Sequence, residues 1–349
     1  MPSYKITRGL RSHTAHVQEG RPFEVPAKST LLMAAHAAGI DWPYGCRVGL
    51  CGQCRCKLLH GQVSPLGDMS MTLDQSSIEQ GYILACRSLL DSNILILPPD
   101  NQSAESDEMS GKILSTNLQT AEIMTVHIQL DQPMRTAYFA GQYARLSVPD
   151  VVPPRCFSFG TACRGDGVIE FHVRLFPDGQ LASWLRETDR SGEGVTLSQP
   201  LGEIGLRNAE HGQPLLFVAG GTGVSPILAM IEELACLGEA PPAVTFVYAA
   251  RDQAHLYVTD QLKQLRSQWR GTDRFKFIPI LSREAPSSDW QGLRGHIFDH
   301  LDEIIEENSA NHAFLCGPPG LVDATELTLL KGGWDRARIS ADRFLPAFD

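Results

Sequence analysis

The chain of 349 residues is long enough for two or three domains with cores of their own. Its formal net charge is −10, and the whole acidic excess lies beyond residue 105, which argues against nucleic acid as a partner. The longest apolar runs are only strand-sized, and the N-terminus lacks a basic segment followed by an apolar stretch. We therefore expect neither a membrane span nor a secretory signal.

The sequence contains nine cysteines, an odd count, and four of them form the pattern described below. The other five show no spacing typical of a disulfide framework: Cys56, Cys156, Cys163, Cys236 and Cys316. Free cysteines of this kind indicate a reducing compartment, so we expect a cytoplasmic protein.

Residues 1–103 are predicted to form the first domain. The expected elements, in chain order, are two short strands within 13–25, a helix over 29–38 and a strand over 94–97. Ser29 or Thr30 is the candidate cap of the helix, and Gly39 is the residue expected to end it. The polar stretch 98–110 has little apolar content and is the best candidate for a linker.

A cysteine-rich loop lies between that helix and the last strand. Cys46, Cys51 and Cys54 follow a C-x4-C-x2-C pattern, and Cys86 follows after 31 further residues. Plant-type ferredoxins hold a [2Fe–2S] cluster with this spacing. A structural zinc site is the alternative, but such sites prefer paired C-x2-C units. We predict one [2Fe–2S] cluster on these four cysteines and expect Cys56 not to be a ligand.

Four basic residues lie near these cysteines in the sequence: Arg47, Arg55, Lys57 and Arg87. They form either a solvated polar rim or a docking face for an acidic electron acceptor. The sequence leaves both interpretations open.

Residues 108–210 are predicted to form a second, all-β domain. The candidate strands are 125–130, 143–148, 157–161, 168–175 and 194–198, and one helix is expected over 181–187. Short strands between turn-rich segments are typical of a small antiparallel β-barrel. Arg155, Phe157 and Ser158 offer it a cation for phosphate, an aromatic plane for stacking and a hydroxyl for a ring nitrogen. Patterns this short are also common without any function.

Residues 211–349 alternate between apolar strands and helices. The candidate strands are 215–219, 244–248, 275–281 and 313–316, and the candidate helices are 226–237, 256–268, 297–307 and 321–330. This alternation predicts a doubly wound parallel α/β sheet. Asp323 and Glu326 belong to no motif, and we expect them to be solvated.

Two turns in this third domain follow apolar strands. Residues 220–223 read Gly-Gly-Thr-Gly between a strand and a helix, where glycines let a backbone approach a pyrophosphate at a helix N-terminus. The alternative is a plain glycine turn. Cys316 and Gly317 end a later strand, where the ligand crevice of a parallel sheet lies. A buried structural cysteine is the alternative there.

The order of these motifs resembles the reductase components of bacterial multicomponent oxygenases, over nearly the whole chain. Segments that carry the resemblance are Cys54-Arg55-Cys56-Lys57, Tyr82-Ile83-Leu84-Ala85-Cys86 and Gly141-Gln142-Tyr143. The best match is to reductases of naphthalene dioxygenase-type aromatic-ring hydroxylating dioxygenases. The family implies a multidomain α+β and α/β fold: a β-grasp ferredoxin domain, an antiparallel β-barrel that binds FAD, and a doubly wound parallel α/β domain that binds NAD(P).

The resemblance implies a flavin site in the second domain. Arg155 would bind FAD phosphate, and Phe157 would stack on the isoalloxazine where the family usually has Tyr. Ser158 would be a catalytic contact near the flavin N5. The residues that would line the flavin or its pyrophosphate are His172, Val173, Arg174, Gly179 and Ser183. The usual hydroxyl of the last segment is displaced by one position here.

The resemblance also implies a dinucleotide site in the third domain. Its residues would be Gly220, Gly221, Thr222, Gly223, Arg251, Asp252, Cys316 and Gly317. Cys316 would be a second catalytic residue, beside the nicotinamide, and Phe344 would approach the flavin. Asp252 would repel a 2′-phosphate and Arg251 would attract one, and the resemblance favours NADH.

The implied function is electron transfer from NADH through FAD to the [2Fe–2S] cluster, and on to a Rieske-type ferredoxin or a terminal oxygenase. FAD connects a two-electron donor to a one-electron acceptor, and the cofactors carry this chemistry. The alternative enzyme is the reductase of a soluble diiron monooxygenase. From other classes, a flavin and iron–sulfur redox sensor and a zinc-stapled scaffold are the alternatives. We expect a monomer.

Overall fold

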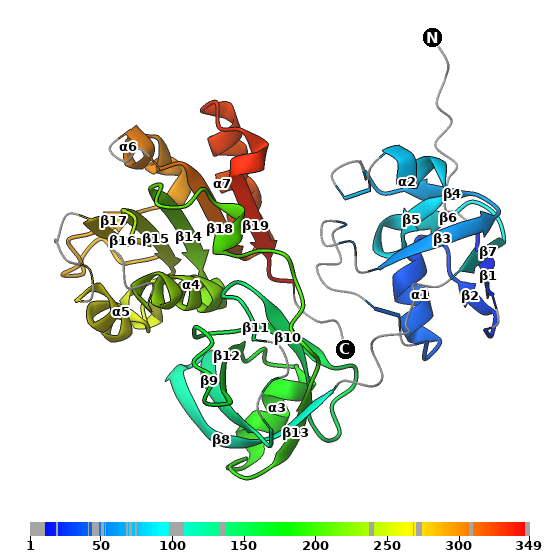
Figure 1. The fold of residues 1–349 in the computed structure, drawn as a ribbon, viewed down its shortest axis with the longest axis horizontal. Helices are drawn as coiled ribbons and strands as arrows, with labels where there is room; N and C mark the ends of the chain where they lie inside the picture. Colours follow the sequence, from blue (N-terminus) through cyan, green and yellow to red (C-terminus); the bar gives the residue numbers. More distant parts are fainter. Residues whose placement is uncertain are drawn as a thin grey trace. The chain divides into compact units, whose positions relative to one another are not determined.

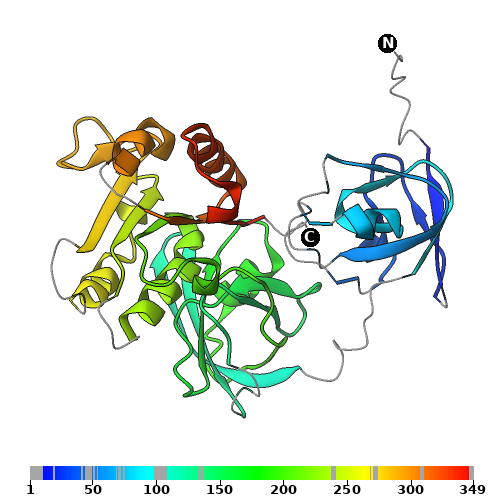
Figure 2. The same cartoon turned by 45° about the horizontal axis from the view of Figure 1, so that its top comes forward.

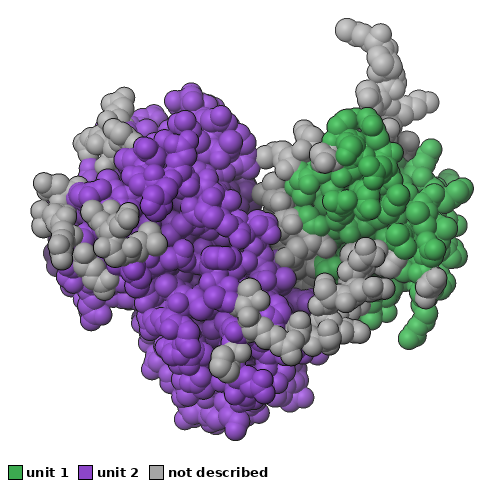
Figure 3. All heavy atoms as spheres, in the orientation of Figure 1, with its two compact units in different colours: residues 1–106 green, residues 107–349 purple. Residues whose placement is uncertain are grey.

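The computed structural model describes residues 11–18, 20–40, 42–43, 49, 52, 54–67, 69, 72–73, 75–97, 108–132, 134, 137–236, 241–267, 269, 274–306 and 310–345. The chain divides into two compact units, residues 1–106 and residues 107–349, which are coloured separately in Figure 3. No helix among the described residues is both long enough and apolar enough to cross a bilayer.

Unit 1 is built on a five-stranded sheet of order β2-β1-β7-β3-β5. Its strands are β1 (His13–Val17), β2 (Phe23–Val25), β3 (Arg55–His60), β5 (Tyr82–Leu84) and β7 (Ile94–Leu97). β1 and β7 are parallel, and the other pairs are antiparallel. The other elements are α1 (Leu31–Ala37), β4 (Val63–Pro65), α2 (Gln75–Glu79), a 3-10 turn (Ala85–Arg87) and β6 (Ser88–Leu90).

Helix α1 confirms the predicted helix, and β7 coincides with the predicted strand. Thr30 is the cap, because its Oγ1 accepts a hydrogen bond from the Met33 N–H at 3.3 Å. Gly39 follows the helix with φ +72°, a conformation that favours glycine. One face of α1 packs into the apolar core of unit 1, which also contains the buried Trp42.

Unit 2 begins with a six-stranded antiparallel sheet of order β11-β10-β13-β8-β9-β12. Its elements are β8 (Met109–Thr120), β9 (Ile123–Leu130), β10 (Tyr143–Ser147), β11 (Arg155–Ser158), β12 (Val168–Arg174), α3 (Gln180–Glu187) and β13 (Gly194–Leu197). A bridge between Phe159 and Phe171 joins the two edges of this sheet. We call these elements the antiparallel part.

Strand β8 has no counterpart among the predicted strands, and the predicted linker runs into its first residues. Its burial does not alternate regularly, and its pairing with β9 shifts register twice. Its second half contains no buried residue, so the sequence there carries no period-two pattern of apolar residues. The strand forms because β13 and β9 pair with it on both sides.

The rest of unit 2 is a six-stranded sheet of order β17-β16-β15-β14-β18-β19, parallel throughout. We call it and its helices the parallel part. The strands are β14 (Leu215–Gly220), β15 (Val244–Ala250), β16 (Phe275–Leu281), β17 (Leu293–Arg294), β18 (His312–Gly317) and β19 (Ile339–Arg343). The helices are α4 (Val224–Cys236), α5 (Thr259–Arg266), α6 (Leu301–Glu306) and α7 (Pro319–Lys331).

The predicted doubly wound arrangement is confirmed, because helices cover both faces of this sheet. Alternate side chains of β14 enter two cores: Leu215 and Phe217 pack with α4 and α5, whereas Leu216 and Val218 pack with α6 and α7. Figures 1 and 2 show α4 and α5 on one face and α6 and α7 on the other. The strand order reverses between β14 and β18, which is where α/β sheets of this kind bind ligands.

Candidate functional site

Two of the four predicted cluster ligands lie in the described part of unit 1. Cys54 precedes β3 and Cys86 follows β5, and these strands pair antiparallel, so the two cysteines meet at one end of the ladder. The Cys86 N–H donates to the Cys54 Sγ at 3.5 Å, and both residues are buried. Cys46 and Cys51 lie outside the described residues. An N–H directed at a ligand sulfur is one way in which proteins tune iron–sulfur clusters.

Cys56 belongs to the apolar core of unit 1. It lies within β3 opposite Ile83 and is 1% exposed. Its side chain packs among the residues that hold α1 against the sheet. The loop residues Gly49 and Gly52 both have positive φ, +87° and +71°, so the cysteine loop needs glycine at these positions.

Two of the basic residues near the cysteines stack on one aromatic ring. The Arg55 guanidinium carbon lies 3.9 Å from the centroid of Tyr82, and the Lys57 Nζ lies 5.5 Å from it. Arg55 is exposed and Arg87 is half-buried. Arg47 lies outside the described residues.

The predicted flavin motif forms β11, at one edge of the antiparallel sheet. Arg155 is 8% exposed, and its guanidinium donates to the Pro153 carbonyl. The Phe157 ring is half-buried, with its centroid 5.7 Å from that of Phe171. The Ser158 carbonyl accepts from the Ser225 Oγ at 3.2 Å, which ties the end of β11 to the start of α4.

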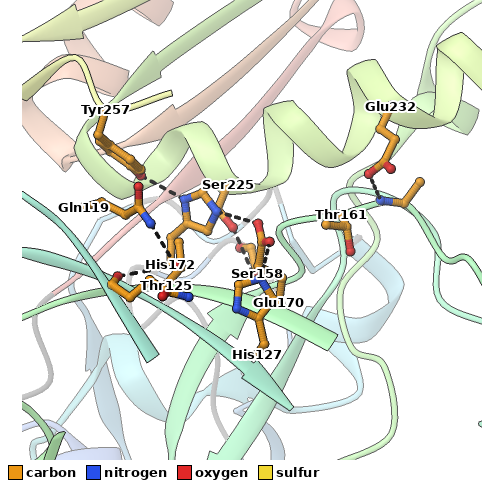
Figure 4. Close-up of polar contacts among 12 residues, drawn as sticks. Gln119, Thr125, His127, Ser158, Thr161, Glu170, His172, Ser225, Glu232 and Tyr257 are labelled. Atoms are coloured by element: carbon orange, nitrogen blue, oxygen red, sulfur yellow. Dashed lines mark hydrogen bonds and ion pairs between the residues drawn. The ribbon is translucent and has the colours of Figure 1, made fainter. Parts of the chain in front are cut away.

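The two faces of strand β12 have different surroundings. Phe171 and Val173 point into the core of the antiparallel part. His172 is buried but points the other way: its Nδ1 lies 2.9 Å from the Tyr257 hydroxyl of the parallel part, and its Nε2 lies 2.9 Å from Glu170. Figure 4 shows His172 between these two partners.

Glu170 is the charged centre of this network. Burial opposes its ionised form, but hydrogen bonds from His127 and His172 lower the pKa of Glu170 to about 2. The His127 Nε2 lies 2.8 Å from its carboxylate. Burial raises the pKa of Tyr257 well above its ordinary value, so its hydroxyl stays protonated. Because the His172 Nε2 donates to Glu170, the Nδ1 is the ring nitrogen left to accept from this hydroxyl. The polar pocket beside the network has a volume of about 140 Å³.

The predicted pyrophosphate contact on α3 is less enclosed. Gly179 precedes the helix with extended backbone, and its carbonyl accepts from the Ser183 N–H at 2.9 Å. The Ser183 side chain is on the exposed side of α3.

The glycine loop lies at the strand-order reversal. A Cβ at Gly223 would lie 2.2 Å from the Cys316 carbonyl oxygen, and a Cβ at Gly317 would lie 2.7 Å from that of Gly220. These glycines therefore pack backbone against backbone. Gly221 differs: it has φ +56°, and a Cβ there would meet nothing within 4 Å. It is the glycine of this loop that leaves room for a ligand.

Cys316 is enclosed at the end of β18, with 1% of its surface exposed. Burial raises the pKa of its thiol well above the ordinary value, so the thiol stays protonated. Asp342 of β19 is its partner in the strand pairing of β18 with β19. The Phe344 N–H donates to the Gly317 carbonyl at 2.8 Å. The structure thus brings Phe344 to the same end of the sheet as Cys316.

Arg251 and Asp252 follow β15, one strand away from the glycine loop. The Arg251 guanidinium forms an ion pair with Glu122, which lies in the turn between β8 and β9. The Asp252 carboxylate lies 2.6 Å from the His255 Nδ1.

Several residues of these networks have no counterpart in the sequence predictions: Glu122, His127, Glu170 and Tyr257. Each has at least one partner that is remote in the chain, so no local spacing marks them. The expectation that Asp323 and Glu326 are solvated is wrong for Glu326. It is 8% exposed and forms ion pairs with Arg336 and Arg343, and the pair with Arg343 ties α7 to β19.

Comparisons with known proteins identify two domain families in the chain. Residues 15–91 match the 2Fe-2S iron-sulfur cluster binding domain, and residues 217–326 match the oxidoreductase NAD-binding domain. The chain is 33% identical over 335 residues to the xylene/toluene monooxygenase electron transfer component of Pseudomonas putida, covering 93% of this chain and 91% of that protein. The chain belongs to the reductase components of oxygenases.

Two other proteins are similar to this chain over nearly their whole length. The anthranilate 1,2-dioxygenase electron transfer component of Acinetobacter baylyi is 29% identical, covering 94% of this chain and 95% of that protein. The ferredoxin reductase in carbazole 1,9a-dioxygenase shares the fold, with a TM-score of 0.64 at 24% identity, over 96% of this chain and 99% of that one.

As an oxygenase reductase, the protein is an oxidoreductase with [2Fe–2S], FAD and NADH as cofactors, and it transfers electrons to an oxygenase. Its residues fit these groups. The buried Cys54 and Cys86 lie next to each other, the Phe157 ring is partly open, and Gly221 leaves space at the strand-order reversal.

Proposed function

We propose a route for electrons through three domains, residues 1–103, 108–210 and 211–349, arranged as a β-grasp ferredoxin domain, a flavin-binding β-barrel and a dinucleotide domain. The cluster ligands are Cys46, Cys51, Cys54 and Cys86. Arg155 holds FAD phosphate, Phe157 stacks on the isoalloxazine, and Ser158 contacts the flavin near N5. FAD held by these residues would supply the chemistry that connects NADH, a two-electron donor, to the one-electron cluster.

The observation that carries this proposal is the contact between the two motifs of unit 2. Ser225 follows the glycine loop, and its hydroxyl donates to the carbonyl of Ser158 in the flavin motif. Ser225 is 2% exposed and Ser158 is 7% exposed, so the contact is shielded from water. The dinucleotide loop and the flavin strand are thereby held together, as hydride transfer between two bound cofactors requires.

The remaining site residues orient the two cofactors. His172, Val173 and Arg174 line the flavin, and Gly179 and Ser183 lie near its pyrophosphate. Gly220, Gly221, Thr222 and Gly223 receive the dinucleotide pyrophosphate, with the space at Gly221 as the point of closest approach. Cys316, Gly317 and Phe344 form the end of the crevice, and a protonated Cys316 is a packing contact rather than a nucleophile.

The Cys86→Ser variant tests the order of the route. We expect it to lose iron and sulfide, to keep NADH-to-ferricyanide turnover through FAD, and to lose electron transfer to the oxygenase. The matched control is Cys56→Ser, which alters another buried cysteine of the same core and should keep all three properties. Iron and sulfide analysis with both assays checks this. Loss of the cluster in Cys56→Ser with retention in Cys86→Ser would refute the ligand assignment.

We propose that the electron acceptor is an acidic Rieske-type ferredoxin or the terminal oxygenase itself, and that it docks over Arg55 and Lys57. We also propose that the reductase is a monomer. The second candidate acceptor is a monooxygenase. It is supported by the sequence comparison, because this chain is more similar to a monooxygenase component than to a dioxygenase component. Attraction between exposed charges is screened over roughly 10 Å at 0.1 M salt.

Charge reversal at Arg55 and Lys57 to Glu tests this docking. We expect slower transfer to the true acceptor at low salt, by about tenfold, because steering by charge raises association rates by 10- to 1,000-fold. Ferricyanide reduction, which needs no protein docking, is the control. An acceptor rate indifferent to both salt and charge reversal would leave these residues as a solvated rim.

A further inference from the structure

Arg251 occupies a position that matters for the choice between NADH and NADPH. It follows β15, and the pairing of Gly220 with Ala249 places it beside the glycine loop. The residue after the second strand of such a sheet lies near the adenosine ribose, where an arginine accommodates the 2′-phosphate of NADPH. A free guanidinium here would bind that phosphate through charge-assisted hydrogen bonds.

The guanidinium of Arg251 is already engaged. Its Nη2 forms an ion pair with the Glu122 carboxylate and lies 2.8 Å from the His255 Nε2. The same Glu122 oxygen lies 3.3 Å from the Arg174 Nη2, on the strand that carries His172. The hydrogen bond from Arg251 is the largest cause of the lowered pKa of Glu122, so this carboxylate is ionised. Arg251 therefore reaches toward the antiparallel part.

The other charged groups at this edge of the sheet are mostly acidic. Asp252 is held by His255, and Glu284 and Asp289 both accept from the Gln253 side chain. Arg283 is an exposed cation next to them, and its N–H donates to the Arg251 carbonyl at 2.7 Å. The half-buried Arg294 also faces this edge, because its charge helps to lower the pKa of Glu284. A 2′-phosphate would therefore meet three carboxylates, the exposed Arg283 and Arg294 once Arg251 is excluded.

We propose that Glu122 is a specificity-determining residue: it holds Arg251 away from the ribose, and the enzyme thereby selects NADH over NADPH. This inference rests on the proposed placement of the dinucleotide at the carboxyl ends of β14 and β15. The determinant then lies in the antiparallel part, outside the sheet that binds the nucleotide. A purely structural ion pair is the competing interpretation, and it predicts no effect on the ratio of the two affinities.

Glu122→Gln separates the two interpretations. Both side chains of the pair are 35% exposed, and such pairs contribute little to stability, so the variant should fold. Binding of NAD⁺ and NADP⁺ to the oxidised, cofactor-loaded protein is measured by titration calorimetry, which is independent of turnover. We expect the ratio of the NADP⁺ to the NAD⁺ dissociation constant to fall about fivefold, because Arg251 becomes available to the 2′-phosphate.

Two further variants identify the cause. Adding Arg251→Ala to Glu122→Gln should abolish the gain in NADP⁺ affinity relative to NAD⁺, because the cation that binds the phosphate is removed. Glu203→Gln removes an exposed carboxylate that pairs with Arg207, and its ratio should stay at the wild-type value. A gain that persists without Arg251, or an equal gain in Glu203→Gln, would assign the effect to net charge and overturn the inference.

The remaining outcomes distinguish this inference from the proposed function. An unchanged ratio in Glu122→Gln, with normal NAD⁺ binding by the wild type, would overturn only the role of Glu122. An NAD⁺ affinity that Gly221→Val leaves unchanged would contradict the placement of the dinucleotide, and the inference would fail with it.

Discussion

Two of the polar contacts that join the antiparallel and parallel parts of unit 2 differ in their access to water. The His172 side chain is 1% exposed where it contacts Tyr257, whereas Glu122 and Arg251 are each 35% exposed where they pair. Removing one partner of a buried network leaves the other without a hydrogen bond, whereas water replaces a lost partner at the surface. The buried contact of His172 with Tyr257 is therefore suited to hold the two parts in a fixed geometry. The exposed pair of Glu122 and Arg251 can change with little loss of stability, which suits a role in cofactor specificity.

The largest effect is expected from Glu170→Gln, which removes the charge at the centre of the buried network. The folded-state pKa of about 2 lies below the ordinary value of 4.5, so the carboxylate stabilises the fold above pH 4.5 and this contribution is lost as pH falls toward 2. A shift of that size corresponds to about 3 kcal/mol.

Denaturation at several pH values, with flavin release as the signal for unfolding, checks this prediction. The free energy of unfolding of the variant should fall below that of the wild type by about 3 kcal/mol at pH 7, and the difference should shrink as pH falls from 4.5. A difference that is constant with pH would mean that the charge of Glu170 is not the source of the stability.

A smaller loss is expected from Tyr257→Phe, because the His172 Nδ1 loses its donor inside the protein. We expect a cost of about 1–3 kcal/mol and slower flavin reduction by NADH in a single turnover. The matched control is Tyr138→Phe, since the Tyr138 hydroxyl is also buried but bonds to Thr161 within the antiparallel part. Equal slowing in both variants would mean that the Tyr257 contact has no special role in joining the parts.

The smallest effect on stability is expected at the open contact. Glu122→Gln should change the free energy of unfolding by no more than about 1 kcal/mol, and high salt should erase the change. Thermal unfolding at low and high ionic strength measures it. A loss as large as that of Tyr257→Phe would remove the distinction between the two contacts.

The sequence predicts what depends on local spacing. The cysteine pattern, the Thr30 cap and the strand–loop–helix at residues 220–223 all depend on neighbours in the chain, and the structure or the family comparisons support each. Contacts between distant segments leave no such mark: His172 and Tyr257 lie 85 positions apart. Strand β8 was also beyond prediction, because its pairing partners rather than its own pattern hold it in the sheet.

The close packing of Gly223 against Cys316, and of Gly317 against Gly220, limits how this enzyme can change. At both positions even a methyl group would overlap a backbone oxygen of the neighbouring strand. The spacing between β14 and β18 at this end of the sheet is therefore set by main-chain atoms. Selection can alter the surrounding side chains one at a time, but the backbone geometry here can change only if both strands move together.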